Sequence, residues 1–99
     1  MMSRADILEQ LIGWFSQQCN GLWEHGSGVT IESLDNPGWS VKINLRETPF
    51  EFTQLDEINL VKGDNNWIQC FKKDGDFIGA GDLSKLPAIL EYFLTFVGR

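Results

Sequence analysis

The side chains best suited to catalysis lie close together near the start of the chain. Cys19, Glu24 and His25 share one short segment, and His25 is the only histidine. Acid–base or thiol chemistry would need a nucleophile, a base and an orienting group within hydrogen-bond reach. Glu24 is badly placed to orient His25, because neighbouring residues of an extended loop point in opposite directions. We expect no catalytic residues; a small enzyme using His25 or a cysteine is the alternative.

The sequence holds no complete pattern for a zinc, calcium or phosphate site. Zinc sites use three or four Cys, His or carboxylate ligands, usually in close pairs, whereas Cys19 and Cys70 are far apart in the sequence. A disulfide bond between these two cysteines remains an alternative. Residues 74–76 (Asp-Gly-Asp) lack the spacing of a calcium loop and indicate a hairpin turn. Residues 79–81 (Gly-Ala-Gly) lack the Lys-Ser/Thr of a phosphate loop, which favours close backbone packing or a bulge at these residues. We expect no metal and no cofactor.

Two helices and about five strands should position these residues. Ser3 and Asp6 resemble a capping box for a helix over residues 4–18, whose apolar stripe is Ile7, Leu8, Leu11, Ile12 and Phe15. Alternating patterns predict strands over residues 29–34, 39–45, 57–61, 67–72 and 77–80, with an extended crossing or short strand at 50–52. A last helix should begin near Asp82 or Ser84 and end at about Val97. Residues 1–99 therefore predict one α+β domain, in which an antiparallel β-meander of about five strands follows the N-terminal helix and both helices pack on one sheet face.

A turn follows the first predicted strand. In Asn36-Pro37-Gly38, Pro37 fixes φ and Gly38 permits a positive φ, and Trp39 then opens the clearest strand in the chain. We expect Asn36, Pro37, Gly38 and Trp39 to serve the fold.

Side-chain parity constrains this hairpin. Apolar residues of both strands share a face only if the connection holds an odd number of residues or a bulge. We expect a three-residue connection that pairs Ile31 with Ile43 and places Glu32 opposite Lys42.

The charge of the chain restricts its partners. Fourteen acidic residues stand against eight Lys and Arg, giving a formal charge of −6. This charge disfavours nucleic-acid binding, which requires cations, and is compatible with a basic protein partner. We find no segment of transmembrane length and no signal peptide, so we expect no membrane association and a cytoplasmic location.

One run of residues carries a family resemblance. It comprises Trp14-Phe15, then Gln18-Cys19-Asn20-Gly21 leading to Trp23-Glu24-His25, then Asp35-Asn36-Pro37-Gly38-Trp39. With an amphipathic C-terminal helix after it, this run resembles the immunity protein 53 family, and residues 19–39 are the specific part of the match. Members of that family are predicted antidotes encoded beside bacterial polymorphic toxins.

The resemblance implies a non-catalytic antidote whose partner is a cognate toxin domain, with a nuclease as one candidate. Inhibition would be steric and electrostatic. Candidate toxin contacts are Trp23 (as an anchor, if exposed), Glu24, His25, Glu32 and Asp35. A small ligand-binding or adaptor domain with an apolar pocket lined by tryptophans is the other alternative.

Overall fold

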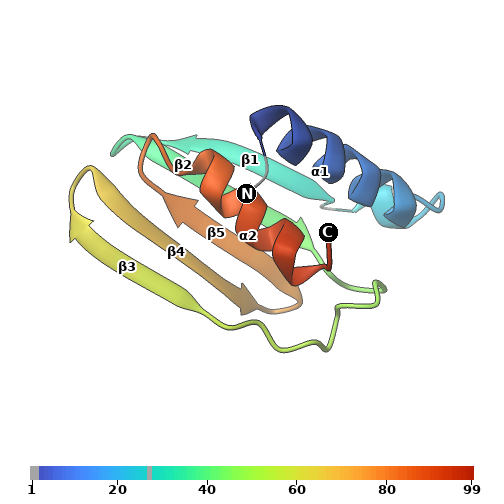
Figure 1. Ribbon diagram of the computed structural model, residues 1–99. Helices are drawn as coiled ribbons and strands as arrows, with labels where there is room; N and C mark the ends of the chain where they lie inside the picture. Colours follow the sequence, from blue (N-terminus) through green and yellow to red (C-terminus); the bar gives the residue numbers. More distant parts are fainter. Residues whose placement is uncertain (1–2, 27) are drawn as a thin grey trace.

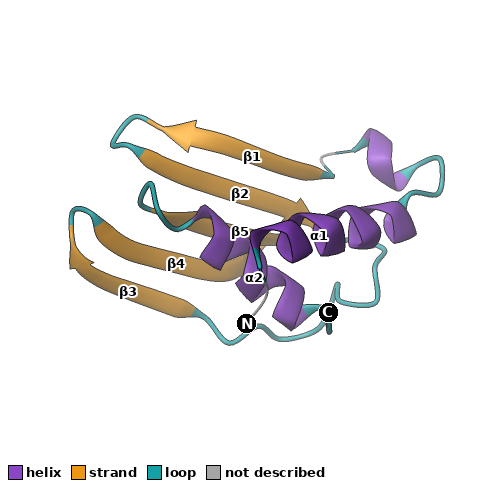
Figure 2. Cartoon of the chain, turned by 45° about the horizontal axis from the view of Figure 1, so that its top comes forward, coloured by secondary structure: helices purple, strands orange, loops and turns teal. Residues whose placement is uncertain are grey.

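The computed structural model describes residues 3–26 and 28–99 and shows an α+β fold, as predicted (Figure 1). In chain order its elements are α1 (Arg4–Gln18), the short 3₁₀ helix η1 (Trp23–His25), β1 (Val29–Leu34), β2 (Gly38–Asn44), β3 (Ile58–Gly63), β4 (Asn66–Lys73), β5 (Asp76–Gly81) and α2 (Leu86–Phe96). Both helices lie on one face of the sheet, side by side, with α1 nearer to β1 (Figures 1 and 2). Among the described residues, no helix is long and apolar enough to cross a membrane.

The sheet is antiparallel throughout, and its strand order is β1-β2-β5-β4-β3. The order is not sequential, because residues 45–57 carry the chain across to the far edge before β4 and β5 return to the centre. Lys72 fixes this crossing: its ammonium donates hydrogen bonds to the carbonyls of Phe50, Glu51 and Thr53. The segment at 50–52 is thus a crossing and not a strand. The edges of the sheet are consequently β1 and β3.

The first hairpin has the predicted parity but another register. A three-residue connection joins β1 to β2, as expected, and the apolar residues of the two strands share the helix-facing side. Ile31 lies opposite Val41, and Glu32 lies opposite Ser40. The predicted partners, Ile43 for Ile31 and Lys42 for Glu32, were therefore each wrong by two residues. The reason is that the three-residue connection comprises residues 35–37, which places Leu34 directly opposite Gly38.

The turn residues serve the fold in ways that sequence reasoning only partly foresaw. Gly38 lies at the start of β2 without the expected positive φ. Glycine is required there for another reason: a Cβ atom would lie 2.4 Å from the carbonyl oxygen of Gly81 on β5. The indole N–H of Trp39 donates to the carbonyl of Leu83 at 3.0 Å and so ties β2 to the segment before α2.

The core fills the space between the helices and the sheet. Buried members include Ile7, Leu11 and Trp14 of α1, Val41 and Ile43 of β2, Cys70 of β4, Phe77 of β5, and Ile89, Leu90, Phe93 and Leu94 of α2. The Trp14 ring meets Phe93 edge-on at 4.9 Å between centroids and Trp23 at 5.7 Å, geometries that aromatic pairs prefer. Two of the four tryptophans are therefore core residues, while the other two are half-buried.

Helix α2 rests directly on the backbone of β5. A Cβ atom at Gly79 would lie 2.4 Å from Ile89, and one at Gly81 would lie 2.6 Å from Lys85. This close approach confirms packing as the reason for the two glycines. Helix α2 begins at Leu86, later than predicted. The side chain of Asp82 accepts a hydrogen bond from the Ser84 backbone N–H and so holds residues 82–84 in a turn before the helix.

Candidate functional site

The loop between α1 and η1 is closed by its own polar side chains. The side-chain carbonyl of Asn20 accepts the backbone N–H groups of Leu22 and Trp23, each at 2.9 Å. In return, the Glu24 carboxylate accepts the N–H groups of Asn20 and Gly21 at 2.9 and 2.8 Å. Hydrogen bonds from its own backbone N–H and from that of Asn20 hold the pKa of Glu24 below its usual value. The carboxylate of Glu24 is therefore engaged within the loop.

Trp23 and His25 differ in their exposure to solvent. Trp23 is 5% exposed and lies edge-on between Trp14 and Phe15, at 5.7 and 5.5 Å. The condition under which it would anchor a partner is not met, because its surface is already covered by the core. His25 is exposed. Trp23 thus packs the loop against the core, whereas His25 is exposed to solvent.

Glu32 and Asp35 lie farther along the chain, away from the loop. Glu32 is exposed on the sheet face that carries no helix, and Asp35 is exposed in the connection after β1. The six-residue strand β1 lies between the loop of His25 and Asp35, and at about 3.3 Å per residue it spans roughly 17 Å. The predicted contact residues form a line along the edge strand β1 and not one compact cluster.

The two cysteines are free thiols in different surroundings. Cys70 is 0% exposed in the centre of the sheet, and burial raises its pKa to about 12. Cys19 is exposed at the end of α1, and its thiol donates to the Phe15 carbonyl at 3.3 Å. Among the described residues, no cluster of three or more His, Cys, Asp or Glu side chains could hold a metal ion.

Two buried carboxylates were not foreseen as important by sequence reasoning. Asp82 is 3% exposed and accepts bonds from the Trp67 backbone N–H, from Ser84 and from the Lys85 ammonium at 2.8 Å. The bonds from Lys85 and Ser84 lower its pKa strongly. Asp76, 5% exposed, accepts from the Arg46 guanidinium at 2.9 Å. Both acids hold the two ends of β5 in place.

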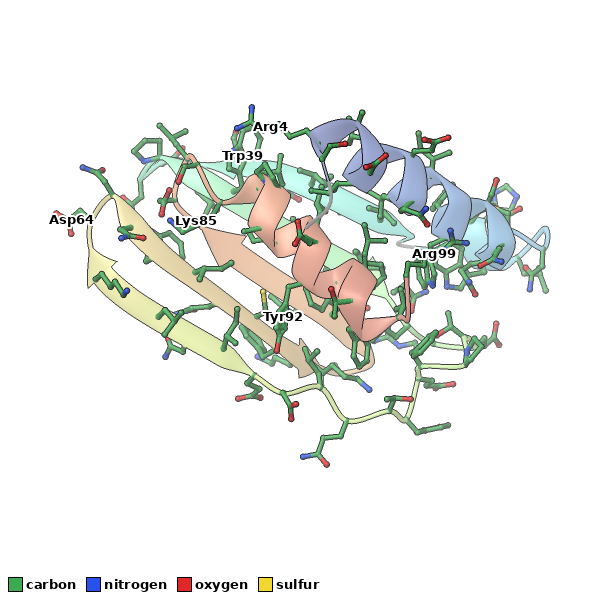
Figure 3. All side chains as sticks on the ribbon, in the orientation of Figure 1. Arg4, Trp39, Asp64, Lys85, Tyr92 and Arg99 are labelled. Atoms are coloured by element: carbon green, nitrogen blue, oxygen red, sulfur yellow. The ribbon has the colours of Figure 1, made fainter. Side chains whose placement is uncertain are left out.

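A groove lies elsewhere, between α2, β3, β4 and the crossing, and Arg4 and Ile7 of α1 also line it. This groove measures about 770 Å³, and its apolar lining includes Leu55, Ile58, Ile68, Tyr92 and Phe96. Tyr92, labelled on α2 in Figure 3, donates a hydrogen bond from its hydroxyl to the Asp56 carbonyl at the rim of the groove. None of the four tryptophans lines it. The tryptophan-lined pocket of the ligand-binding alternative therefore does not correspond to this groove.

Comparison with known proteins gives one result. The model of the family described as immunity protein 53 matches residues 8–98. No curated protein and no solved structure matches the chain.

Proposed function

The chain belongs to the immunity protein 53 family, and from that premise we propose that it is a non-catalytic antidote that binds and blocks a polymorphic toxin domain. The family match over residues 8–98 is the observation that carries this proposal. A toxin encoded beside the gene of this chain is the expected partner, and the bacterial cytoplasm is the expected place of their encounter.

The distribution of charge supports an electrostatic part in the inhibition. Of the fourteen acidic residues, only Asp76 and Asp82 form ion pairs with Lys or Arg among the described residues. Both are buried and serve the fold. The other carboxylates of the described residues form no ion pair with Lys or Arg, so a basic protein surface would gain attraction and a high association rate from them.

We assign the polar contacts to the line of residues along β1. His25, Glu32 and Asp35 present their side chains to solvent. Glu24 and Trp23 would act in support: the carboxylate shapes the loop that presents His25, and the indole fixes that loop to the core. A nuclease is the favoured toxin class, because carboxylates can occupy positions that otherwise hold substrate phosphates.

A co-expression assay tests the proposal. The toxin domain encoded beside this chain's gene is induced in a sensitive host with and without the chain, and survival is counted. We expect growth only when the chain is present, and a stoichiometric complex of the purified proteins whose affinity falls with salt. Killing that is unaffected by the chain, together with no complex at either low or high salt, would refute the antidote function.

The groove beside α2 supports a second candidate, a small-ligand binding domain. Its size and apolar lining suit a small organic molecule. A ligand library screened by thermal unfolding tests this candidate, since a ligand bound only by the native state raises Tm. Leu55→Arg, which would fill the groove, should abolish any such shift if the ligand lies there.

A further inference from the structure

One flank of α1 is apolar and uncovered. Leu8 and Ile12, one helical turn apart, are 56% and 67% exposed, although the sequence pattern placed both in the stripe that faces the core. The opposite flank is covered: the Arg99 guanidinium packs over Gly13 and donates hydrogen bonds to glutamines on either side of it. The Leu8–Ile12 flank therefore points away from α2 and its C-terminal residues.

That uncovered flank is directed towards the edge strand β1. Phe15 continues the flank by one turn, and its ring lies 3.5 Å from where a Cβ atom of Gly28 would be, just before β1. In Figures 1 and 2, α1 lies on the β1 side of α2. Ile31 is 39% exposed on the helix-facing side of β1, opposite Val41. We call Leu8, Ile12 and Ile31 the α1–β1 strip.

The segments that carry the strip, residues 4–35, hold five acids and one cation, Arg4, which lies one helical turn before Leu8. No Lys or Arg occurs between Arg4 and Lys42, whereas Asp6, Glu9, Glu24, Glu32 and Asp35 do. The next cation along the chain, Lys42, lies 3.7 Å from a carboxylate oxygen of Asp76, which also pairs with Arg46 at 2.9 Å. The other edge strand differs, because Lys62 adjoins its exposed apolar residues Leu60 and Val61.

We propose that the α1–β1 strip docks a segment of the toxin in which apolar side chains are flanked by Lys or Arg. This inference rests on the proposed function and specifies the partner of that surface. Apolar anchors inside a charged rim are the usual centre of a protein interface, and the net negative charge of residues 4–35 would attract the basic flanks. A second copy of this chain fits less well, because it would bring the same acids against each other.

Matched double substitutions test the proposal in the full-length protein. The test variant is Leu8→Lys with Ile12→Lys, and the control is Leu60→Lys with Val61→Lys on β3. The two pairs add the same charge, and their exposed fractions match closely: 56% and 67% in the test pair, 55% and 67% in the control pair. Binding of the toxin domain encoded beside the gene is measured by titration calorimetry, after thermal unfolding has shown that both variants fold.

The expected result is a loss of affinity on the order of 100-fold for the test variant and less than about threefold for the control. In the wild-type complex, amide hydrogen exchange should slow across residues 29–34 and stay unchanged across 58–63, a readout that needs no variant. Three results would each overturn the strip as the toxin-docking surface. The first is an equal loss of affinity in both variants, and the second is exchange protection at β3 alone. The third is light scattering that shows a dimer of the free chain dissociating on toxin binding. Failure of the wild-type chain to bind or protect would instead refute the antidote function itself.

Discussion

Replacing Gly79 by alanine should destabilise the protein, because α2 rests on the backbone of β5 at this residue. The new Cβ atom would lie 2.4 Å from Cγ2 of Ile89 and 3.3 Å from Cε2 of Phe77. Carbon atoms attract best at about 3.5–4.0 Å, so α2 must move outward by about 1 Å or Ile89 must leave its rotamer. Ile89 is 0% exposed and has no solvent to turn into. Such overpacking costs about 1–3 kcal/mol, of which the reduced entropy of the unfolded chain offsets about 0.4–1 kcal/mol.

The net loss of about 1–2 kcal/mol corresponds to a decrease in Tm of roughly 5–15 °C for a chain of this size. Urea unfolding and thermal unfolding, both followed by circular dichroism, measure it. Gly63→Ala on β3 is the control, because no atom lies within 4 Å of its Cβ position. Ile89→Leu, which lacks the Cγ2 methyl group, should make the double variant less destabilised than the sum of the single changes. If Gly79→Ala is as stable as Gly63→Ala, the close contact between α2 and β5 is refuted.

Three further predictions follow from the loop and the thiols. Trp23→Ala should lower the free energy of unfolding by about 3–5 kcal/mol, measured in urea, because it empties a buried aromatic cluster; a loss below about 1 kcal/mol would contradict its burial. A thiol reagent should modify Cys19 in the native protein and Cys70 only after unfolding, and equal rates would exclude the buried position of Cys70. Because folding lowers the pKa of Glu24, its stabilising effect is present at neutral pH and is lost as the pH falls from about 4 towards the folded pKa. Urea midpoints between pH 7 and 3 should therefore fall less steeply for Glu24→Gln than for the wild type, and identical slopes would count against the capping role of this carboxylate.

Local sequence signals predicted most of the elements. The bounds of α1 are confirmed at both ends, and Ser3 accepts the Asp6 backbone N–H at 3.2 Å, as the capping pattern required. The connection between β4 and β5 is the expected hairpin turn, with Asp74 and Gly75 both at positive φ. These features depend on interactions between residues only a few positions apart, so a short stretch of sequence is enough to predict them.

Features that depend on distant contacts were predicted less well. Sequence could not show that Gly38 is needed for the close approach of Gly81, because these residues meet only after the strands assemble. The apolar stripe of α1 was wider than the surface that the sheet offers, and nothing local showed that the flank with Leu8 and Ile12 would stay uncovered. For the same reason, the contact residues predicted from one sequence segment lie spread along β1.

Most Lys and Arg side chains of this chain connect segments of the fold and do not pair with surface carboxylates. Five of the eight Lys and Arg side chains are engaged in holding segments together: Lys42, Arg46, Lys72, Lys85 and Arg99. Arg99 and Lys72 bind neutral oxygens, so these two cations neutralise no surface carboxylate. Glu32 and Asp35, both exposed, can then be changed with little effect on folding, since exposed charges contribute little to stability. Under the proposed function, these two acids can therefore change to suit a toxin without loss of the sheet beneath them.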